Sequence, residues 1–170
     1  SAACNPQQPE TTIPIIATNP EVNLPTVQET QVPTETIEND LPKSFKVVDA
    51  LGREIVFEKI PERIVVVGKA LFMVADAIYL FPEAGQRIIA IGDTQQGAGN
   101  FIPMIDSTFK NKIIIESEAG PEQIAAAQPD CVILKSSNAE KLGTPLEILG
   151  IPVVYLDFET PEQYQRDLKT

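Results

Sequence analysis

The stretch GPEQIAAAQPDCVIL, residues 120–134, decides the fold. Its proline at position 121 suits the first turn of a helix, so the stretch predicts a helix over 121–127. Pro129 and Asp130 then favour a turn. The apolar run Cys131–Leu134 is short enough to be a strand that is covered on both faces. The stretch therefore predicts a helix that leads directly into a buried strand.

The same alternation continues on both sides of this stretch. Four more short apolar runs predict buried strands, at 63–67, 87–91, 112–115 and 153–156. Helical patterns lie between or after them, at 71–80, at 139–149 and from Pro161 onward. Alternating strands and helices imply right-handed βαβ units, so we predict an α/β fold with a mainly parallel sheet and flanking helices.

A β-hairpin is predicted ahead of this sheet. Runs 45–49 and 54–57 are rich in strand-forming residues, and Gly52 lies in the turn between them. In open parallel sheets ligands bind beyond the carboxyl ends of the strands. The loops in which binding residues are expected are therefore 68–70, 92–101, 116–120 and 135–138.

The first 43 residues differ from the rest of the chain. Residues 5–43 hold seven prolines and no aromatic residue, and they carry six acidic groups against Lys43 alone. Such a segment cannot bury enough apolar surface to offset its ordering entropy, so we predict a disordered linker. The remaining 127 residues, 44–170, suffice for one domain.

Cys4 follows three small residues, Ser1-Ala2-Ala3, an arrangement similar to the lipobox at which bacterial lipoproteins are cleaved and acylated. The match is partial, because the first position is usually Leu and no apolar segment precedes it. Cys4 is therefore a candidate lipidation site, and residues 5–43 would be its tether. The alternative is a chance run of small residues before a free cysteine.

Charge and composition exclude several functions. Residues 44–170 carry 18 Asp and Glu against 12 Lys and Arg, so a nucleic-acid partner is not expected. The chain has no histidine, which removes the commonest metal ligand and general base, and its two cysteines suggest neither a disulfide framework nor a metal site. No metal site and no cofactor are predicted.

Catalytic and nucleotide motifs are incomplete. Gly92 and Gly97 have the spacing of P-loop glycines, but Ala98 and Gly99 stand where Lys and Ser or Thr are required. No G-x-S-x-G motif is present, and without histidine a Ser-His-Asp mechanism is excluded. Glu116 and Glu118 are more typical of a solvated edge than of acid–base chemistry. We therefore predict a binding module and not an enzyme.

In order and spacing, residues 45–170 resemble the periplasmic binding proteins for iron siderophores, haem and vitamin B12. The resemblance rests on FKVVDALGREIVF, IPERIVVVG, the stretch 120–134 and LGIPVVYLD. It implies one lobe of a class III periplasmic-binding-protein fold. Family members have two lobes joined by a long helix and hold the ligand between them. This chain ends where the helix would enter the second lobe, so a fragment or a one-lobed protein with a partner chain is expected.

The resemblance also implies a function and a set of site residues. The expected function is the extracytoplasmic solute-binding component of an ABC importer, anchored to the cell membrane by lipid. It would capture an iron chelate, haem, a corrinoid or a related metal complex and dock to a permease with its ATPase. In this family a carboxylate in the position of Glu122 pairs with an arginine pocket of the permease; the alternative for Glu122 is a favourable charge at a helix start. The candidate ligand-binding residues lie on the loops named above: Lys69, Gln95, Gln96, Asn100, Phe101, Lys135 and Ser136.

Two other functions remain open. A lipid anchor and a long tether would equally serve a surface-displayed scaffold or adhesion module with no transported ligand. A fragment of a Rossmann-type enzyme is the third alternative. Association with a permease and an ATPase would favour import over both.

Overall fold

A parallel sheet of five strands organises the structure, a computed structural model that describes residues 44–93 and 101–170. The order across the sheet is β5-β4-β3-β6-β7. The chain thus builds outward from β3 to β5, returns to the other side of β3 and continues to β7. The strands are β3 (Ile64–Val66), β4 (Ile88–Gly92), β5 (Ile113–Ile115), β6 (Cys131–Leu134) and β7 (Val153–Tyr155).

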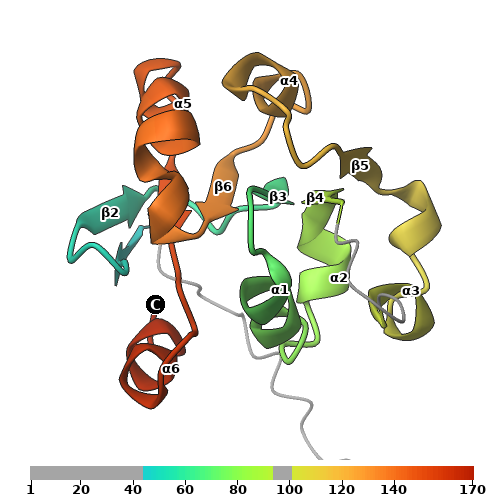
Figure 1. The fold of residues 1–170 in the computed structure, drawn as a ribbon, viewed down its shortest axis with the longest axis horizontal. Helices are drawn as coiled ribbons and strands as arrows, with labels where there is room; N and C mark the ends of the chain where they lie inside the picture. The colour runs from blue at the N-terminus through green and yellow to red at the C-terminus, as the bar shows by residue number, and fades with distance from the viewer. Residues whose placement is uncertain (1–43, 94–100) are drawn as a thin grey trace, which may run out of the picture. The chain divides into compact units, whose positions relative to one another are not determined.

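Helices cover both faces of this sheet (Figure 1). One face is covered by α4 (Pro121–Ala125) and α5 (Thr144–Ile148), and the other by α1 (Phe72–Ile78), α3 (Ile102–Ile105) and α6 (Pro161–Asp167). The remaining helical turns are α2 (Ala84–Arg87), η1 (Phe109–Asn111), η2 (Ser136–Asn138) and the π-helical turn η3 (Ala139–Gly143). None of the helices in the two described ranges is long and apolar enough to cross a membrane.

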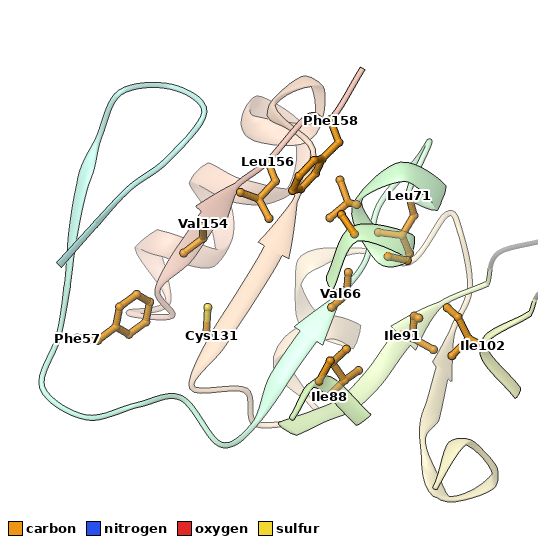
Figure 2. Close-up of a cluster of buried hydrophobic side chains, with 14 residues drawn as sticks. Phe57, Val66, Leu71, Ile88, Ile91, Ile102, Cys131, Val154, Leu156 and Phe158 are labelled. Carbon is orange, nitrogen blue, oxygen red and sulfur yellow. The ribbon is translucent and has the colours of Figure 1, made fainter. Parts of the chain in front are cut away.

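Each face of the sheet has its own hydrophobic cluster, because successive residues of a strand point to opposite sides. Val66 packs with α1 and α3 in one cluster, whereas Val65 and Val67 pack with α4 and α5 in the other. Figure 2 shows the first cluster, which extends from Phe57 at one end to Ile102 at the other. The predicted α/β fold with a parallel sheet is confirmed.

The predicted hairpin is also confirmed. Strands β1 (Phe45–Val48) and β2 (Glu54–Phe57) pair antiparallel, and Gly52 in the turn has φ +74°, a conformation that favours glycine. Arg53 joins the hairpin to the sheet, because its guanidinium donates to the buried Asp49 carboxylate and to the carbonyl of Val153. The hairpin is thereby fixed against β7.

The Pro-Asp turn of the stretch 120–134 has a clear structural role. The Asp130 carboxylate accepts hydrogen bonds from the backbone N–H groups of Glu62 and Arg63, each at 2.9 Å. The Arg63 guanidinium donates to the carbonyls of Ala127 and Gln128. These bonds align the start of β3 with the start of β6, so Ile64 pairs with Cys131 in the sheet.

A buried polar network joins the elements next to α2. The side chains of Asp106 and Lys112 are each 3% exposed, and the Lys112 ammonium lies 3.2 Å from the Asp106 carboxylate. Tyr79 and Thr108 also donate to this carboxylate. Burial alone would raise the pKa of Asp106, but the hydrogen bonds from Thr108, Tyr79 and Lys112 outweigh it and lower that pKa.

Two expectations were wrong in detail, and two helical turns were not expected. The helix expected over 139–149 consists of the π-helical turn η3 followed by α5. A Cβ atom on Gly143 would lie only 1.7 Å from the Tyr155 hydroxyl, so this helical turn approaches β7 more closely than any other residue would permit. The run 112–115 is not covered on both faces, because β5 is an edge strand and Ile113 and Ile114 are about half exposed. The turns α2 and α3 were not predicted.

Candidate binding edge of the sheet

The candidate site lies where the chain reverses direction in the sheet. From β3 the chain proceeds to β4 on one side, and from its neighbour β6 it proceeds to β7 on the other. The loops that leave β3 and β6 therefore diverge, and such a switch point is where open α/β sheets hold ligands. Residues 68–70 and 135–138 follow these two strands, so two of the expected loops meet here.

Asn138 joins the two loops. Its side-chain oxygen accepts a hydrogen bond from the backbone N–H of Lys69 at 3.3 Å, and its amide nitrogen donates to the Lys69 carbonyl at 3.4 Å. Gly68 has φ +101°, and a Cβ atom there would lie 3.0 Å from the Asn138 amide nitrogen. The glycine thus permits the close approach. We did not single out Asn138 from the sequence, because its partner lies 69 residues away.

Lys69 is solvent-accessible and lies at the edge, as a binding residue would. Its side chain is 62% exposed, and its ammonium pairs with the Glu118 carboxylate at 2.8 Å. Glu118 lies in the loop after β5, and it also accepts a hydrogen bond from Lys141 of η3 at 3.3 Å. The structure therefore brings together three charged groups from the loop after β3, the loop after β5 and the helical turn η3.

Lys135 occupies a different environment from Lys69. Its side chain is only 5% exposed, although it is charged, and its ammonium is paired with the carboxylate of Glu159 in the loop after β7. A buried ammonium requires such a partner. Lys135 thus connects the loops after β6 and β7, and its charge is already compensated within the protein.

Ser136 belongs to a network that reaches helix α6. The Asp157 carboxylate accepts from the Ser136 hydroxyl at 2.6 Å and from the Arg166 guanidinium at 2.9 Å. Burial alone would raise the pKa of Asp157, but the bonds from Ser136 and Arg166 outweigh it and lower that pKa. The network attaches Arg166, near the C-terminal end of α6, to the candidate edge.

Asp167 attaches α6 to the loop after β7 through its buried carboxylate. Its side chain is fully buried, and one carboxylate oxygen accepts from the backbone N–H groups of Asp157 at 2.7 Å and Phe158 at 3.0 Å. The other oxygen accepts from Arg166 at 2.6 Å. The bond to Asp167 is the main reason that the pKa of Arg166 is raised. The direction of α6 is thus set by charged hydrogen bonds to the loop after β7.

The other candidate residues lie further apart or outside the described ranges. Phe101 is partly exposed just before α3. Glu122 is exposed in the first turn of α4, with no side-chain partner in residues 44–93 and 101–170. Four candidates fall outside these ranges: Cys4, Gln95, Gln96 and Asn100. The described part contains no group of three or more His, Cys, Asp or Glu side chains that could hold a metal ion.

Comparisons with known proteins agree with this fold. No protein-family model and no curated protein matches the sequence. A TroA-like periplasmic binding protein, FepB from Veillonella parvula, is similar in structure with a TM-score of 0.56 and 16% identity; the match covers 72% of this chain and 40% of that one. A periplasmic solute binding protein from Veillonella parvula DSM 2008 matches with a TM-score of 0.56, 21% identity and coverages of 72% and 38%.

A third solved structure extends the comparison to another organism. A periplasmic solute binding protein from Mycobacterium smegmatis str. MC2 155 matches with a TM-score of 0.50 and 20% identity, over 74% of this chain and 47% of that one. At this identity the likeness concerns the fold. The chain spans less than half the length of these structures. Residues 44–170 therefore have the architecture of one lobe of a class III periplasmic-binding-protein fold, as the resemblance implied.

Proposed function

We propose that this chain supplies one lobe of an extracytoplasmic solute-binding protein, which captures a metal chelate and delivers it to an ABC importer. The observation that carries the proposal is the parallel sheet with a switch point, in a fold that is similar to solved periplasmic solute-binding proteins at a TM-score of 0.56. The cargo would be an iron chelate, haem, a corrinoid or a related complex. The protein would bind this cargo without chemical conversion.

The binding surface would be the carboxyl edge of the sheet. Lys69 offers an accessible charge there, and Ser136 offers a hydroxyl next to the switch point. Lys135 would act through its ion pair with Glu159, which holds two edge loops together. Phe101, Gln95, Gln96 and Asn100 would add aromatic and amide contacts from the loop after β4. A second lobe would supply the opposite wall of the cleft.

Membrane attachment is a further part of the proposal. Cys4 would carry the lipid, residues 1–4 would be the remnant of a lipobox, and residues 5–43 would tether residues 44–170 to the membrane. The proline-rich, acidic composition of residues 5–43 supports this assignment. A tether would let the lobe reach a permease while remaining at the cell surface.

Glu122 would dock the lobe to the permease. It is exposed and lacks a side-chain partner in the described part of the chain, so its charge is available to an arginine of another protein. The test uses the two-lobed protein and its permease in vesicles. Ligand affinity and uptake are measured for Glu122→Ala and Glu122→Lys, with Glu58→Ala as a control that removes an exposed glutamate after the hairpin.

We expect both Glu122 variants to keep the wild-type ligand affinity and to lose uptake several-fold, with the larger loss for Glu122→Lys because it adds repulsion. The Glu58 control should transport normally. Normal uptake by Glu122→Lys would contradict the docking role. Absence of chelate binding and of permease association would instead favour the surface scaffold.

A further inference from the structure

Three charged side chains meet at the binding edge from different parts of the chain. Lys69 follows β3, Glu118 follows β5 and Lys141 belongs to η3 after β6. The Lys69 ammonium lies 2.8 Å from one Glu118 oxygen, and the Lys141 ammonium lies 3.3 Å from the other. Each oxygen of the Glu118 carboxylate is therefore paired with one lysine ammonium. Two oxygens of an anionic ligand could be bound by the two lysines in the same way.

All three side chains are accessible to a ligand. Lys69, Glu118 and Lys141 are each more than half exposed. Within residues 44–93 and 101–170 neither ammonium has a second carboxylate partner. Hydrogen bonds from the two lysines, and from Lys69 first, lower the pKa of Glu118. The single Glu118 carboxylate offsets only one of the two positive charges, so the three side chains keep a net positive charge that an anion can meet.

We propose that Lys69 and Lys141 form a binding site for an anionic chelate. The Glu118 carboxylate occupies this site in the free protein, and the ligand displaces it on binding. This inference rests on the proposed function and adds to it the charge class of the ligand and a residue that tunes affinity. A neutral chelate would gain nothing from the displacement. The site therefore selects anionic complexes with hydrogen-bond-accepting oxygens on their surface.

Glu118 can be displaced because its ion pairs with the two lysines are exposed to solvent. Exposed ion pairs are weak, because water and salt screen them and both side chains lose freedom when they pair. The pair between Lys135 and Glu159 differs, since burial of Lys135 makes loss of its partner costly. Asn138 holds the backbone of Lys69 by two hydrogen bonds, so Lys69 keeps its place when Glu118 leaves.

The test measures binding of two inert, diamagnetic octahedral complexes that differ in charge. Tris(oxalato)cobalt(III) is an anion and tris(acetylacetonato)cobalt(III) is neutral. Dissociation constants for the whole chain come from the amide NMR shifts of residues 68–70, 116–120 and 135–142. The variants are Glu118→Gln and the double variant Glu118→Gln with Lys141→Gln. Glu54→Gln is the matched control, because Glu54 is similarly exposed and pairs with Lys46 on the hairpin.

We expect Glu118→Gln to tighten binding of the anionic complex about three- to tenfold, since both lysines are released from their exposed pairs. Binding of the neutral complex should not change, the double variant should lose the gain, and Glu54→Gln should stay within about twofold of wild type. An unchanged affinity of Glu118→Gln for the anionic complex, or an equal gain in Glu54→Gln, would overturn the inference. In that case, amide NMR shifts at residues 68–70 and 135–138 on addition of a complex would still support binding at this edge, and the proposed function would stand. No shift at these loops with either complex in any variant would also overturn the inference, whereas the proposed function is tested separately by chelate binding and uptake of the two-lobed protein.

Discussion

Removal of the Asp167 carboxylate tests how α6 is attached to the sheet. The carboxylate accepts from the backbone N–H groups of Asp157 and Phe158 and from the Arg166 guanidinium, and the side chain is fully buried. In Asp167→Ala the two backbone groups lose a charged acceptor in a place where water does not replace it. Each such loss costs about 1.5 to 3 kcal/mol.

We therefore expect Asp167→Ala to lower the free energy of unfolding by about 3 to 5 kcal/mol. This is a large part of the roughly 5 to 15 kcal/mol of a typical domain. The assay is urea unfolding followed by circular dichroism, with hydrogen exchange of the α6 amides to locate the damage. Gln165→Ala is the control, because Gln165 lies on the same helix and is exposed.

The control should stay within about 0.5 kcal/mol of wild type, as surface substitutions usually do. A loss below 1 kcal/mol in Asp167→Ala, with unchanged protection of the α6 amides, would refute the reasoning. In that case α6 would be held by its apolar contacts alone. The direction of α6 would then not depend on this carboxylate.

Three further predictions concern the edge, the acid stability and the anchor. Gly68→Ala should cost about 1 to 3 kcal/mol in urea unfolding, because φ +101° strains an alanine and its Cβ would press on Asn138; a stability equal to wild type would contradict this. Asp106 has a lowered pKa in the folded state, so the stability that it contributes is present above its ordinary pKa near 4 and is lost as the pH falls through the lower folded value. Unfolding free energies from pH 7 to pH 2 should therefore fall less steeply in Asp106→Asn, and parallel curves would disprove this. Cys4→Ser should release the protein from membranes of the source organism into the soluble fraction, and unchanged partitioning would remove the anchor hypothesis.

Much of the fold follows from local patterns in the sequence. The predicted strand Cys131–Leu134 has the observed bounds, because a turn precedes it and apolar residues fill it. The hairpin follows from two β-rich runs and Gly52, which adopts the positive φ that its turn requires. The helix from Pro161 onward is found as α6, with a Thr160 cap that bonds the backbone N–H of Gln163. These features depend on residues that are close in the chain.

Other features depend on contacts that a single sequence does not display. The π-helical turn contains Gly143, which lies so close to Tyr155, twelve residues along the chain, that no side chain would fit there. The exposure of Ile113 and Ile114 results from the edge position of β5, which only the strand order reveals. The one-turn helices α2 and α3 are too short for a helical period to appear.

The candidate site shows the same division. The edge loops could be predicted, because the carboxyl ends of parallel strands mark them, and Lys69 lies there with an accessible charge. The burial of Lys135 and the hydrogen bonds by which Asn138 joins two loops could not be predicted, because both depend on partners from other loops. The type of a side chain indicates what it can bind. Tertiary contacts decide whether that side chain is already paired within the protein.

Native mass spectrometry of the complete protein, isolated from its source, tests the central claim most directly. The account predicts a bound metal complex of defined mass, which leaves on denaturation and whose charge is negative when released. Elemental analysis of the same sample should detect the metal in proportion to the protein. A protein that is isolated free of any complex, and that takes up none when anionic and neutral chelates are added, would contradict the account.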